Sequence, residues 1–314
     1  MQDTESRRDG AGPLVGNLLT LAAIVLWASS FLATDRLLAS WNPVWLTVGR
    51  ILGAGLILLG FCALTGRLGT LRPDSWPKTA GASVLGFGMA GLAIVVGQKY
   101  ADPVTTAIIV TSGPLISALL GILDGSERPS PHLWAGIAMA MVGGVLASLE
   151  PGSWLPAPKG GELLVLLSQL LWIWYSRISA SGLGALDAVA KSTLGLTTGG
   201  LFLLAVAGLG TLFGLVPLEI DTSPTSLALL GWLAGFSIAV SVSLWLAGVR
   251  ILGATIASIH TNLAPFYVML MALLLTGAAP GPGQILGGAL VAGGAVLAQW
   301  PSIRRALAGP APIC

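Results

Sequence analysis

Gly16-Asn17-Leu18-Leu19 opens an apolar stretch that reaches Trp27, and Gly161-Glu162-Leu163-Leu164 opens another that reaches Trp172. The second stretch follows the first by 145 residues and nearly repeats it. A repeat of this length is too long for a solenoid unit and is typical of one half of a membrane transporter. If each half holds an odd number of spans, the second half is inverted relative to the first. A site between such halves can open to either side of the membrane.

The end of each repeat is rich in glycine. Gly143-Gly144 in the first repeat corresponds to Gly293-Gly294 in the second. Small residues at spacings of four suit close contact between helices. They are Gly136, Ala140 and Gly144 in the first repeat and Gly288 and Ala292 in the second. We interpret these two helices as packing surfaces without substrate contact.

One proline lies inside an apolar stretch of each repeat. Pro114 in the first repeat corresponds to Pro265 in the second. A proline inside a helix removes a backbone hydrogen bond and frees a carbonyl. We therefore predict hinges at both prolines. The freed carbonyls would lie near Thr111-Ser112 and near Asn262, where they could accept a hydrogen bond from a substrate amine.

The composition is that of a helical membrane protein. The chain is 54% hydrophobic and 9% charged and contains 43 glycines; its mean hydropathy is +0.87. Soluble domains carry roughly 25% charged residues, so a soluble fold is excluded. Cys62 and Cys314 show no pairing or metal-binding pattern. We expect no disulfide framework, no metal and no cofactor.

Uncharged runs of about 20 residues are long enough to cross a bilayer. We predict an all-α integral membrane protein with ten transmembrane helices, arranged as two inverted five-helix repeats. The predicted boundaries are a cytoplasmic tail at 1–13, a first repeat at 14–150, a second repeat at 151–302 and a cytoplasmic tail at 303–314. The spans are expected at 10–34, 43–65, 79–98, 103–123, 129–149, 161–181, 192–218 and 222–249, with two more within 251–303. The span from Gly161 is the weakest, because Glu162 and Arg177 limit its uncharged core.

The distribution of basic residues orients the chain. With the N-terminus inside, the cytoplasmic segments hold Arg7, Arg8, Arg67, Arg72, Lys78, Arg128, Arg177, Lys191, Arg250, Arg304 and Arg305, whereas the outer side holds Arg36, Arg50, Lys99 and Lys159. This bias predicts that both termini are cytoplasmic. Six tryptophans near span ends are expected to anchor the interface. They are Trp41, Trp45, Trp76, Trp134, Trp154 and Trp300.

Polar side chains recur at helical spacing along four spans. Because hydroxyls and amides are costly in lipid, we expect the stripes to converge on one cavity. The candidate substrate-binding residues are Trp27, Ser30, Thr111, Ser112, Gln169, Trp172, Tyr175, Ser237, Ser241, His260 and Asn262. Hydroxyls in membrane helices also bond their own backbone or a neighbouring helix, which is the structural alternative for each serine and threonine.

Three basic side chains lie within or close to the spans. His260 near mid-membrane could exchange a proton near neutral pH and couple transport to protons, or it could bond a serine across helices as a neutral group. Arg50 is expected to extend to the outer surface, although a substrate carboxylate or backbone carbonyls are alternative partners. Lys191 near the inner end of span seven is its expected structural counterpart.

The chain resembles the drug/metabolite transporter superfamily, specifically its ten-helix type with two EamA-like repeats. The resemblance rests on Leu26-Trp27-Ala28-Ser29-Ser30-Phe31, on Gly49-Arg50, on Pro114 and Pro265, and on the glycine-rich spans five and ten. It covers the chain from Leu14 to Pro301. Leu275-Thr276-Gly277 departs from it, because the family often has an acidic residue there, whereas the first half keeps Glu127 in a related place.

Within that superfamily the chain is most similar to bacterial exporters of aromatic amino acids and related metabolites. The resemblance implies a two-fold inverted bundle in the bacterial inner membrane. It also implies that spans five and ten are peripheral and that the substrate path lies between the halves.

The chemistry of the predicted cavity limits the solute. The absence of a carboxylate in mid-span argues against export of lipophilic cations. The absence of a cluster of basic residues there argues against a carrier of phosphates. A weakly polar, aromatic pocket suits a neutral or zwitterionic solute. The alternatives are export of other metabolites or drugs, an intramembrane enzyme that pairs a serine with His260, a channel, or a membrane scaffold. Besides the solute, the expected partners are the lipid bilayer and possible protons, with no nucleic acid. The expected state is a monomer or weak homodimer.

Overall fold

The computed structural model describes residues 2–125, 130–147, 160–181, 183, 186–252 and 260–307, and every regular element within these ranges is helical. The first half contains α1 (Gln2–Leu38), α2 (Pro43–Leu64), η1 (Leu68–Thr70), α3 (Trp76–Ser83), η2 (Val84–Met89), α4 (Ala90–Tyr100), α5 (Pro103–Val110), α6 (Gly113–Leu123) and α7 (Pro131–Ala147). The second half contains α8 (Glu162–Ser181), α9 (Ala188–Leu212), α10 (Pro224–Trp232), η3 (Leu233–Val240), α11 (Ser241–Leu252), α13 (Ala264–Thr276) and α14 (Pro282–Leu307).

These elements form ten membrane-spanning helices, five in each half. Six are long and apolar enough to cross a bilayer by themselves, and three shorter apolar helices lie at 131–147, 264–276 and 282–298. The remaining span is α8, for which the sequence gives the weakest prediction of a membrane span. The predicted fold class is confirmed. Helix α1 begins at Gln2, so it includes most of the predicted N-terminal tail.

Several spans begin where a capping side chain precedes proline. Asn42 accepts a hydrogen bond from the backbone N–H of Val44, and Pro43 occupies the first turn of α2. Asp102 caps α5 in the same way, with Pro103 as its first residue. Proline suits the first turn because its missing N–H would have no helical partner there. Each pair therefore sets the depth at which a span begins.

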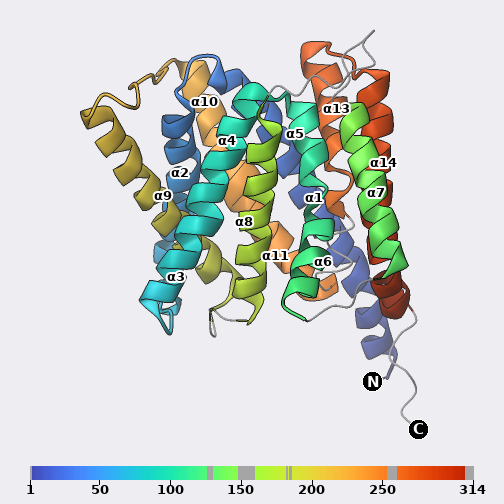
Figure 1. Cartoon of the computed structure of the whole chain (residues 1–314). Helices are drawn as coiled ribbons and strands as arrows, with labels where there is room; N and C mark the ends of the chain where they lie inside the picture. Colours follow the sequence, from blue (N-terminus) through green and yellow to red (C-terminus); the bar gives the residue numbers. More distant parts are fainter. Residues whose placement is uncertain are drawn as a thin grey trace.

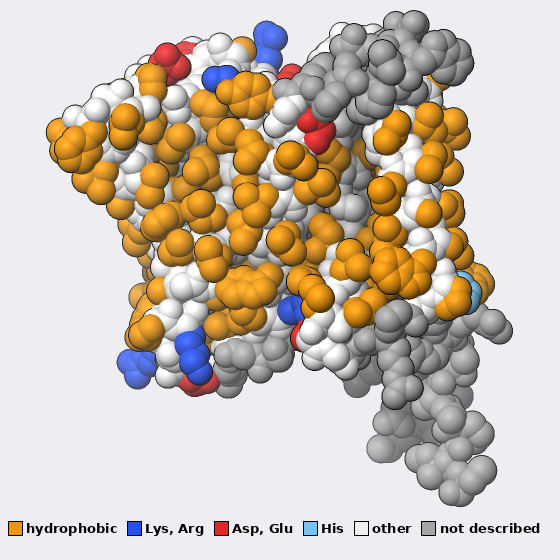
Figure 2. Space-filling model, in the orientation of Figure 1, with side chains coloured by type: hydrophobic (Ala, Val, Ile, Leu, Met, Phe, Trp, Pro, Cys, Tyr) orange, Lys and Arg blue, Asp and Glu red, His pale blue; other side chains and the backbone are white. Residues whose placement is uncertain are grey.

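The charged side chains gather at the two ends of the bundle. Figure 2 shows a wide belt of hydrophobic side chains between them. Leucines of the spans are far more exposed than an interior would allow: Leu64 of α2 is 92% exposed and Leu274 of α13 is 72% exposed. A soluble protein does not expose such an area of apolar surface, whereas lipid tails would cover it. The protein is therefore located in a membrane.

The two halves are antiparallel. Helices α1 and α8 are equivalent, and α1 begins at the end of the bundle where α8 finishes (Figure 1). We call the end where α1 begins and α14 finishes the terminal end, and the end where α1 meets α2 the opposite end. Each half contributes five spans, an odd number, so the inversion follows from the count.

The halves interlock through glycines related by the repeat. A Cβ added to Gly55 of α2 would lie 2.6 Å from the backbone nitrogen of Thr197 of α9. A Cβ added to Gly200 of α9 would lie 2.6 Å from Cα of Leu52 of α2. Gly200 follows Gly55, and Thr197 follows Leu52, by the same 145 residues. This reciprocity shows that α2 and α9 cross on a pseudo-two-fold axis.

Helices α7 and α14, which are spans five and ten, pack along each other at one edge of the bundle (Figure 1). Their contact is made by Gly136 and Gly143 of α7 and Gly287 and Gly294 of α14. Gly144 belongs to the predicted face, but it has no neighbour within 4 Å of an added Cβ. The prediction therefore holds for Gly136 and for Ala140, whose backbone nitrogen lies 3.2 Å from a Cβ added to Gly294, and is wrong for Gly144. The glycines of the contact are spaced by seven, because two full turns return a residue to the same seam.

The interfacial role predicted for the tryptophans agrees with the structure for some of them and not for others. Trp76, Trp134 and Trp300 are 55%, 56% and 44% exposed near span ends, as expected for interfacial anchors. Trp41 is only 6% exposed and packs in a cluster with Leu37 and Leu46, so the anchoring role predicted for it is wrong. Trp154 lies outside the described residues.

Candidate substrate path

Spans four and nine are both interrupted in mid-membrane. Helix α5 ends at Val110 and α6 begins at Gly113, with Thr111 and Ser112 in a turn between them. In span nine, Asn262 and Leu263 form the turn that precedes α13. In each case the interruption comes three residues or fewer before the proline of that span. Proline cannot donate to the carbonyl four residues back, and its ring crowds that carbonyl. Interrupted spans at corresponding places are characteristic of substrate sites in transporters.

Spans three and eight contain matching π-helical segments. Segment η2 includes Gly86-Phe87-Gly88, and η3 includes Gly235-Phe236-Ser237. Each π segment continues an α-helix without a cap, so each span bulges where it faces the other half. Such bulges occur frequently at functional sites. The sequence analysis missed them, although the repeated Gly-Phe pair is a signal that could have located them.

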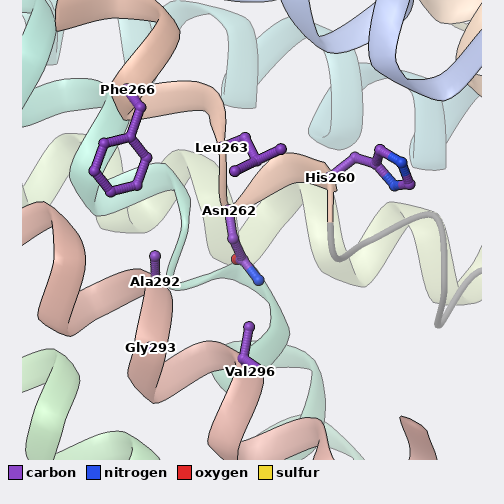
Figure 3. Close-up of a pocket in the computed structure, with 7 residues that line it drawn as sticks. All are labelled: His260, Asn262, Leu263, Phe266, Ala292, Gly293 and Val296. Atoms are coloured by element: carbon purple, nitrogen blue, oxygen red, sulfur yellow. The ribbon is translucent and has the colours of Figure 1, made fainter. Parts of the chain in front are cut away.

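A pocket of about 270 Å³ lies beside the interruption of span nine. It is lined by His260, Asn262, Leu263 and Phe266 around the interruption of span nine and by Ala292, Gly293 and Val296 of α14 (Figure 3). The side chain of Asn262 is directed towards Val296, whereas the imidazole of His260 points away from α14 (Figure 3). Span ten was expected to make no substrate contact, yet α14 supplies one wall of this pocket.

Three polar atoms at this interruption are buried without a hydrogen-bond partner among the described residues: Nδ1 of His260, and Nδ2 and Oδ1 of Asn262. Asn262 is only 3% exposed. Buried amides are almost always hydrogen-bonded, so an unpaired amide beside a pocket indicates a place for a polar ligand group or water. Its carbonyl oxygen accepts and its NH₂ group donates, so it can bind both ends of a zwitterion or a neutral amide.

Three aromatic rings form a second group at the π segment of span three. The ring of Phe87 meets Trp172 edge-on at 5.4 Å and Tyr175 edge-on at 4.9 Å, and Trp172 stacks on Tyr175 at 5.8 Å. Gly86 permits this approach, because a Cβ added there would lie 2.4 Å from Cβ of Tyr175. Trp172 and Tyr175 were predicted site residues, whereas Phe87 was missed. Ile238 and Ala239 of span eight belong to the same cluster.

Trp27 lies in a different cluster from its repeat counterpart Trp172. It meets Phe31 edge-on at 5.1 Å and packs with Tyr267 of span nine. Gln169 lies at the interruption of span four, because a Cβ added to Gly113 would be 3.6 Å from its side-chain oxygen. The predicted site residues therefore form two groups. Span one lies beside the interruption of span nine, and span six lies beside the interruption of span four.

The predicted hydroxyl groups mostly bond nearby atoms. Thr111 Oγ1 donates to the carbonyl of Ile108 at 2.7 Å, and Ser241 Oγ donates to the carbonyl of Ser237 at 2.6 Å. Ser237 Oγ lies 3.1 Å from Ser29 Oγ of span one, and Trp232 Nε1 donates to the same Ser29 oxygen. Ser30 is 2% exposed, and Ser112 Oγ is buried without a partner among the described residues. Of Pro114 only the backbone is described; Pro265 is buried in the first turn of α13.

Ion pairs join the two halves at the terminal end. Arg67 of the first half donates to Asp187 of the second at 2.7 Å. Arg177 of the second half pairs with Asp124 of the first and also donates to the carbonyl of Ser117 at 3.3 Å. Each pair therefore links the end of a span in one half to a segment of the other half. Within the described residues no group of three or more histidines, cysteines and carboxylates could hold a metal ion.

Asp187 is also the N-cap of α9, which gives a prediction for stability. Burial alone would raise the pKa of Asp187, but the backbone N–H of Ala190 and the guanidinium of Arg67 together lower it. Asp187→Ala removes the cap and the ion pair and should cost about 1 kcal/mol at pH 7. Asp187→Asn keeps the cap and should cost less, because the ion pair is exposed. Thermal unfolding in detergent micelles measures both.

The same depressed pKa sets the sign of the pH dependence. The stabilisation by Asp187 is complete above its unfolded-state pKa, which is about 4, and is lost as the pH falls through the lower folded-state value. The gap in unfolding midpoint between wild type and Asp187→Ala should therefore narrow from pH 7 towards pH 3. An equal gap at both pH values would contradict the assignment.

A membrane bundle of two inverted halves, with matching interruptions in mid-span and unpaired polar atoms beside a pocket, defines a transporter of small molecules. The comparison with known proteins agrees. The EamA-like transporter family matches residues 14–149 and 159–300. The chain belongs to this family.

Several bacterial proteins are similar along much of the chain. One is named "Uncharacterized inner membrane transporter YedA", from Escherichia coli strain K12, and is 24% identical over 273 residues, which are 84% of this chain and 83% of that protein. Another, from Bacillus subtilis strain 168, is named "Uncharacterized transporter YyaM" and is 25% identical over 209 residues, covering 65% and 67%. A solved crystal structure superposes with a TM-score of 0.67 at 22% identity, over 94% of this chain and 99% of that one, and supports the fold.

Proposed function

We propose that this protein exports a small neutral or zwitterionic metabolite, most simply an aromatic or other apolar amino acid, across the bacterial inner membrane. The observation that carries the proposal is the interrupted span nine, where the unpaired amide of Asn262 adjoins a pocket with apolar walls. The volume of about 270 Å³ is just below that of drug-sized pockets, roughly 300–1,000 Å³, which favours a small solute. The name of the relative YedA supports the inner membrane.

The proposed mechanism is alternating access. Solute enters from the cytoplasm between the halves and binds near Trp27, Trp172, Tyr175, Ser241 and Asn262. The halves then rock about the interruptions at Pro114 and Pro265 and expose the solute to the outside. The ion pairs Arg67–Asp187 and Arg177–Asp124 would close the terminal end in one of the two states. We assign the terminal end to the cytoplasm on the excess of basic residues there.

Flux through purified protein tests the function. Proteoliposomes preloaded with labelled phenylalanine should release it faster than protein-free liposomes. Each of the twenty amino acids is then offered as a competitor, and apolar and aromatic ones should compete best. Flux inhibited only by organic cations or by phosphates would contradict the proposed solute class. Cleavage of an intramembrane peptide without solute flux would indicate an enzyme instead. Reporter fusions at both ends test the topology, which requires both on the cytoplasmic side.

Proton coupling through His260 is a separate prediction. His260 lies at the interruption of span nine, and Nδ1 is buried without a partner among the described residues. If the imidazole carries the coupled proton, His260→Gln should leave flux down a solute gradient and abolish any dependence of that flux on pH. Initial rates at several pH values, with equal pH on both sides, measure this. A retained pH profile would give His260 a structural role.

A further inference from the structure

Arg50 is a cation inside membrane-spanning helix α2, and no carboxylate in the described parts of the chain forms an ion pair with it. It lies seven residues after Pro43, the first residue of α2. By the rise of an α-helix this is about 10 Å from the end of α2 that lies at the opposite end of the bundle. Its side chain is only 7% exposed, so it does not extend to the surface as the sequence analysis expected. Arg50 Nη1 donates to Thr34 Oγ1 of α1 at 3.2 Å, and Nε is buried without a partner. The ion pairs among the described residues do not include it.

A guanidinium in this position needs more acceptors than it has, and a negatively charged acceptor would also offset its charge. Unlike lysine or a carboxylate, arginine stays charged when buried, so it cannot reduce the cost of burial by losing its charge. It has five N–H donors in a planar fork, and a single threonine hydroxyl satisfies one of them. Ionisable groups inside membrane proteins are expensive and mark functional sites by default.

A second unpaired donor lies at the same end of the bundle. Trp41 Nε1 is buried without a partner, and Trp41 itself is 6% exposed. Trp41 belongs to the same hydrophobic cluster as Leu46, one turn before Arg50 on α2, and Leu37, about one turn after Thr34 on α1. Indole and guanidinium groups donate hydrogen bonds and cannot accept them. Two donors without acceptors between the same two helices point to a ligand that accepts.

The second half has a cation that reaches an equivalent place, and its role there is purely architectural. Lys191 of span seven donates to the carbonyl of Ser179 at 2.7 Å. Ser179 follows Thr34 by 145 residues, so both cations reach equivalent places on spans one and six. The second half satisfies its cation with a backbone carbonyl, and Gly195 stands at the position that matches Arg50. What distinguishes Arg50 is that its Nε keeps no partner among the described residues.

We propose that Arg50, with Thr34 and Trp41, forms a subsite that takes the carboxylate of the transported solute at the opposite end of the bundle. The proposal rests on the proposed transport function and specifies its substrate class. A planar carboxylate matches the guanidinium fork, and its single negative charge matches the single cation. The cluster next to it, which includes Leu37, Leu46 and Leu233, is apolar. This end would be the exit side if the terminal end is cytoplasmic.

Matched solutes with and without a carboxylate test the subsite. Proteoliposomes carrying the full chain are assayed with labelled phenylalanine against competing phenylalanine or phenylalaninamide. Wild type should prefer the carboxylate by about tenfold or more, since a charge-assisted hydrogen bond contributes at least that much. Arg50→Gln should reduce this preference to about one by weakening phenylalanine alone, and Arg50→Lys should restore part of it. Lys191→Gln is the matched control and should keep the wild-type preference. Arg50→Gln with an undiminished preference would overturn the proposal.

Two further measurements keep the test decisive. If Arg50→Gln does not fold, Trp41→Phe removes one donor and keeps the aromatic ring. It should weaken phenylalanine several-fold and leave the amide unchanged, and an equal effect on both would overturn the proposal. If wild type moves no amino acid, the proposed function fails, and thermal stabilisation by 3-phenylpropionate then tests the subsite by itself. Stabilisation of wild type and not of Arg50→Gln supports it; no stabilisation, or equal stabilisation by inorganic phosphate, overturns it.

Discussion

Gly143→Val should separate α7 from α14 and destabilise the folded protein by about 3 kcal/mol or more, at the upper end of what overpacking costs. The reason is that a Cβ added at Gly143 would lie 2.7 Å from the carbonyl oxygen of Gly287 and 2.9 Å from the nitrogen of Val291. Both atoms belong to the backbone of α14, so no side-chain rotation can relieve the clash. The thermal midpoint of the protein in lipid nanodiscs measures the effect.

Gly144→Val is the matched control, because it makes the same chemical change one residue further along the same helix. An added Cβ there meets nothing within 4 Å. Its effect should stay within about 1 kcal/mol, as for other exposed sites. If both variants lose the same stability, valine in the helix rather than the α7–α14 contact is responsible, and the assigned packing face is wrong.

Trp172→Ala should lower the rate of solute flux per folded molecule by at least about tenfold, which corresponds to 1.4 kcal/mol. The indole is part of the Phe87–Trp172–Tyr175 group, whose rings are 4.9 to 5.8 Å apart. In the proposed mechanism this group provides the apolar face for the side chain of the solute. Trp172→Phe should recover most of the rate, because an aromatic ring at this place retains the edge-on contact with Phe87.

The control for Trp172 is Trp134→Ala. Trp134 is 56% exposed on α7, away from the aromatic group, and its loss should leave flux unchanged. Because truncation of a packed tryptophan also costs stability, rates are compared at equal amounts of folded protein. A normal rate in folded Trp172→Ala would remove Trp172 from the solute path. A loss of flux in Trp134→Ala as large as that in Trp172→Ala would show that the assay responds to any damage to the bundle.

Much of the architecture could be predicted because its signals are local. An apolar run of about 20 residues is sufficient to predict a span, and the repeat of 145 residues predicts two equivalent halves. The positions of Pro114 and Pro265 predicted disturbed helices, and the structure interrupts both spans just before them. Each of these effects depends only on residues within one or two helical turns.

The site was less predictable, because it depends on contacts between distant segments. The same helical spacing placed Ser237 and Asn262 on polar stripes. The structure pairs Ser237 with Ser29, 208 residues away, and leaves the amide of Asn262 unpaired. Arg50 was expected at the surface, because long basic side chains near span ends usually extend to water. Burial by neighbouring helices prevents this, and no local pattern reports it.

The amino-acid sequence by itself determined the membrane environment, the number of spans and their inversion, since hydropathy, helix length and an odd count per half are properties of the chain. Only the tertiary structure decided which of two adjacent glycines forms the α7–α14 seam, where the π segments bulge, and which buried donors lack an acceptor. Those outcomes depend on which helices pack against each other and how closely, so they exist only once the bundle has assembled.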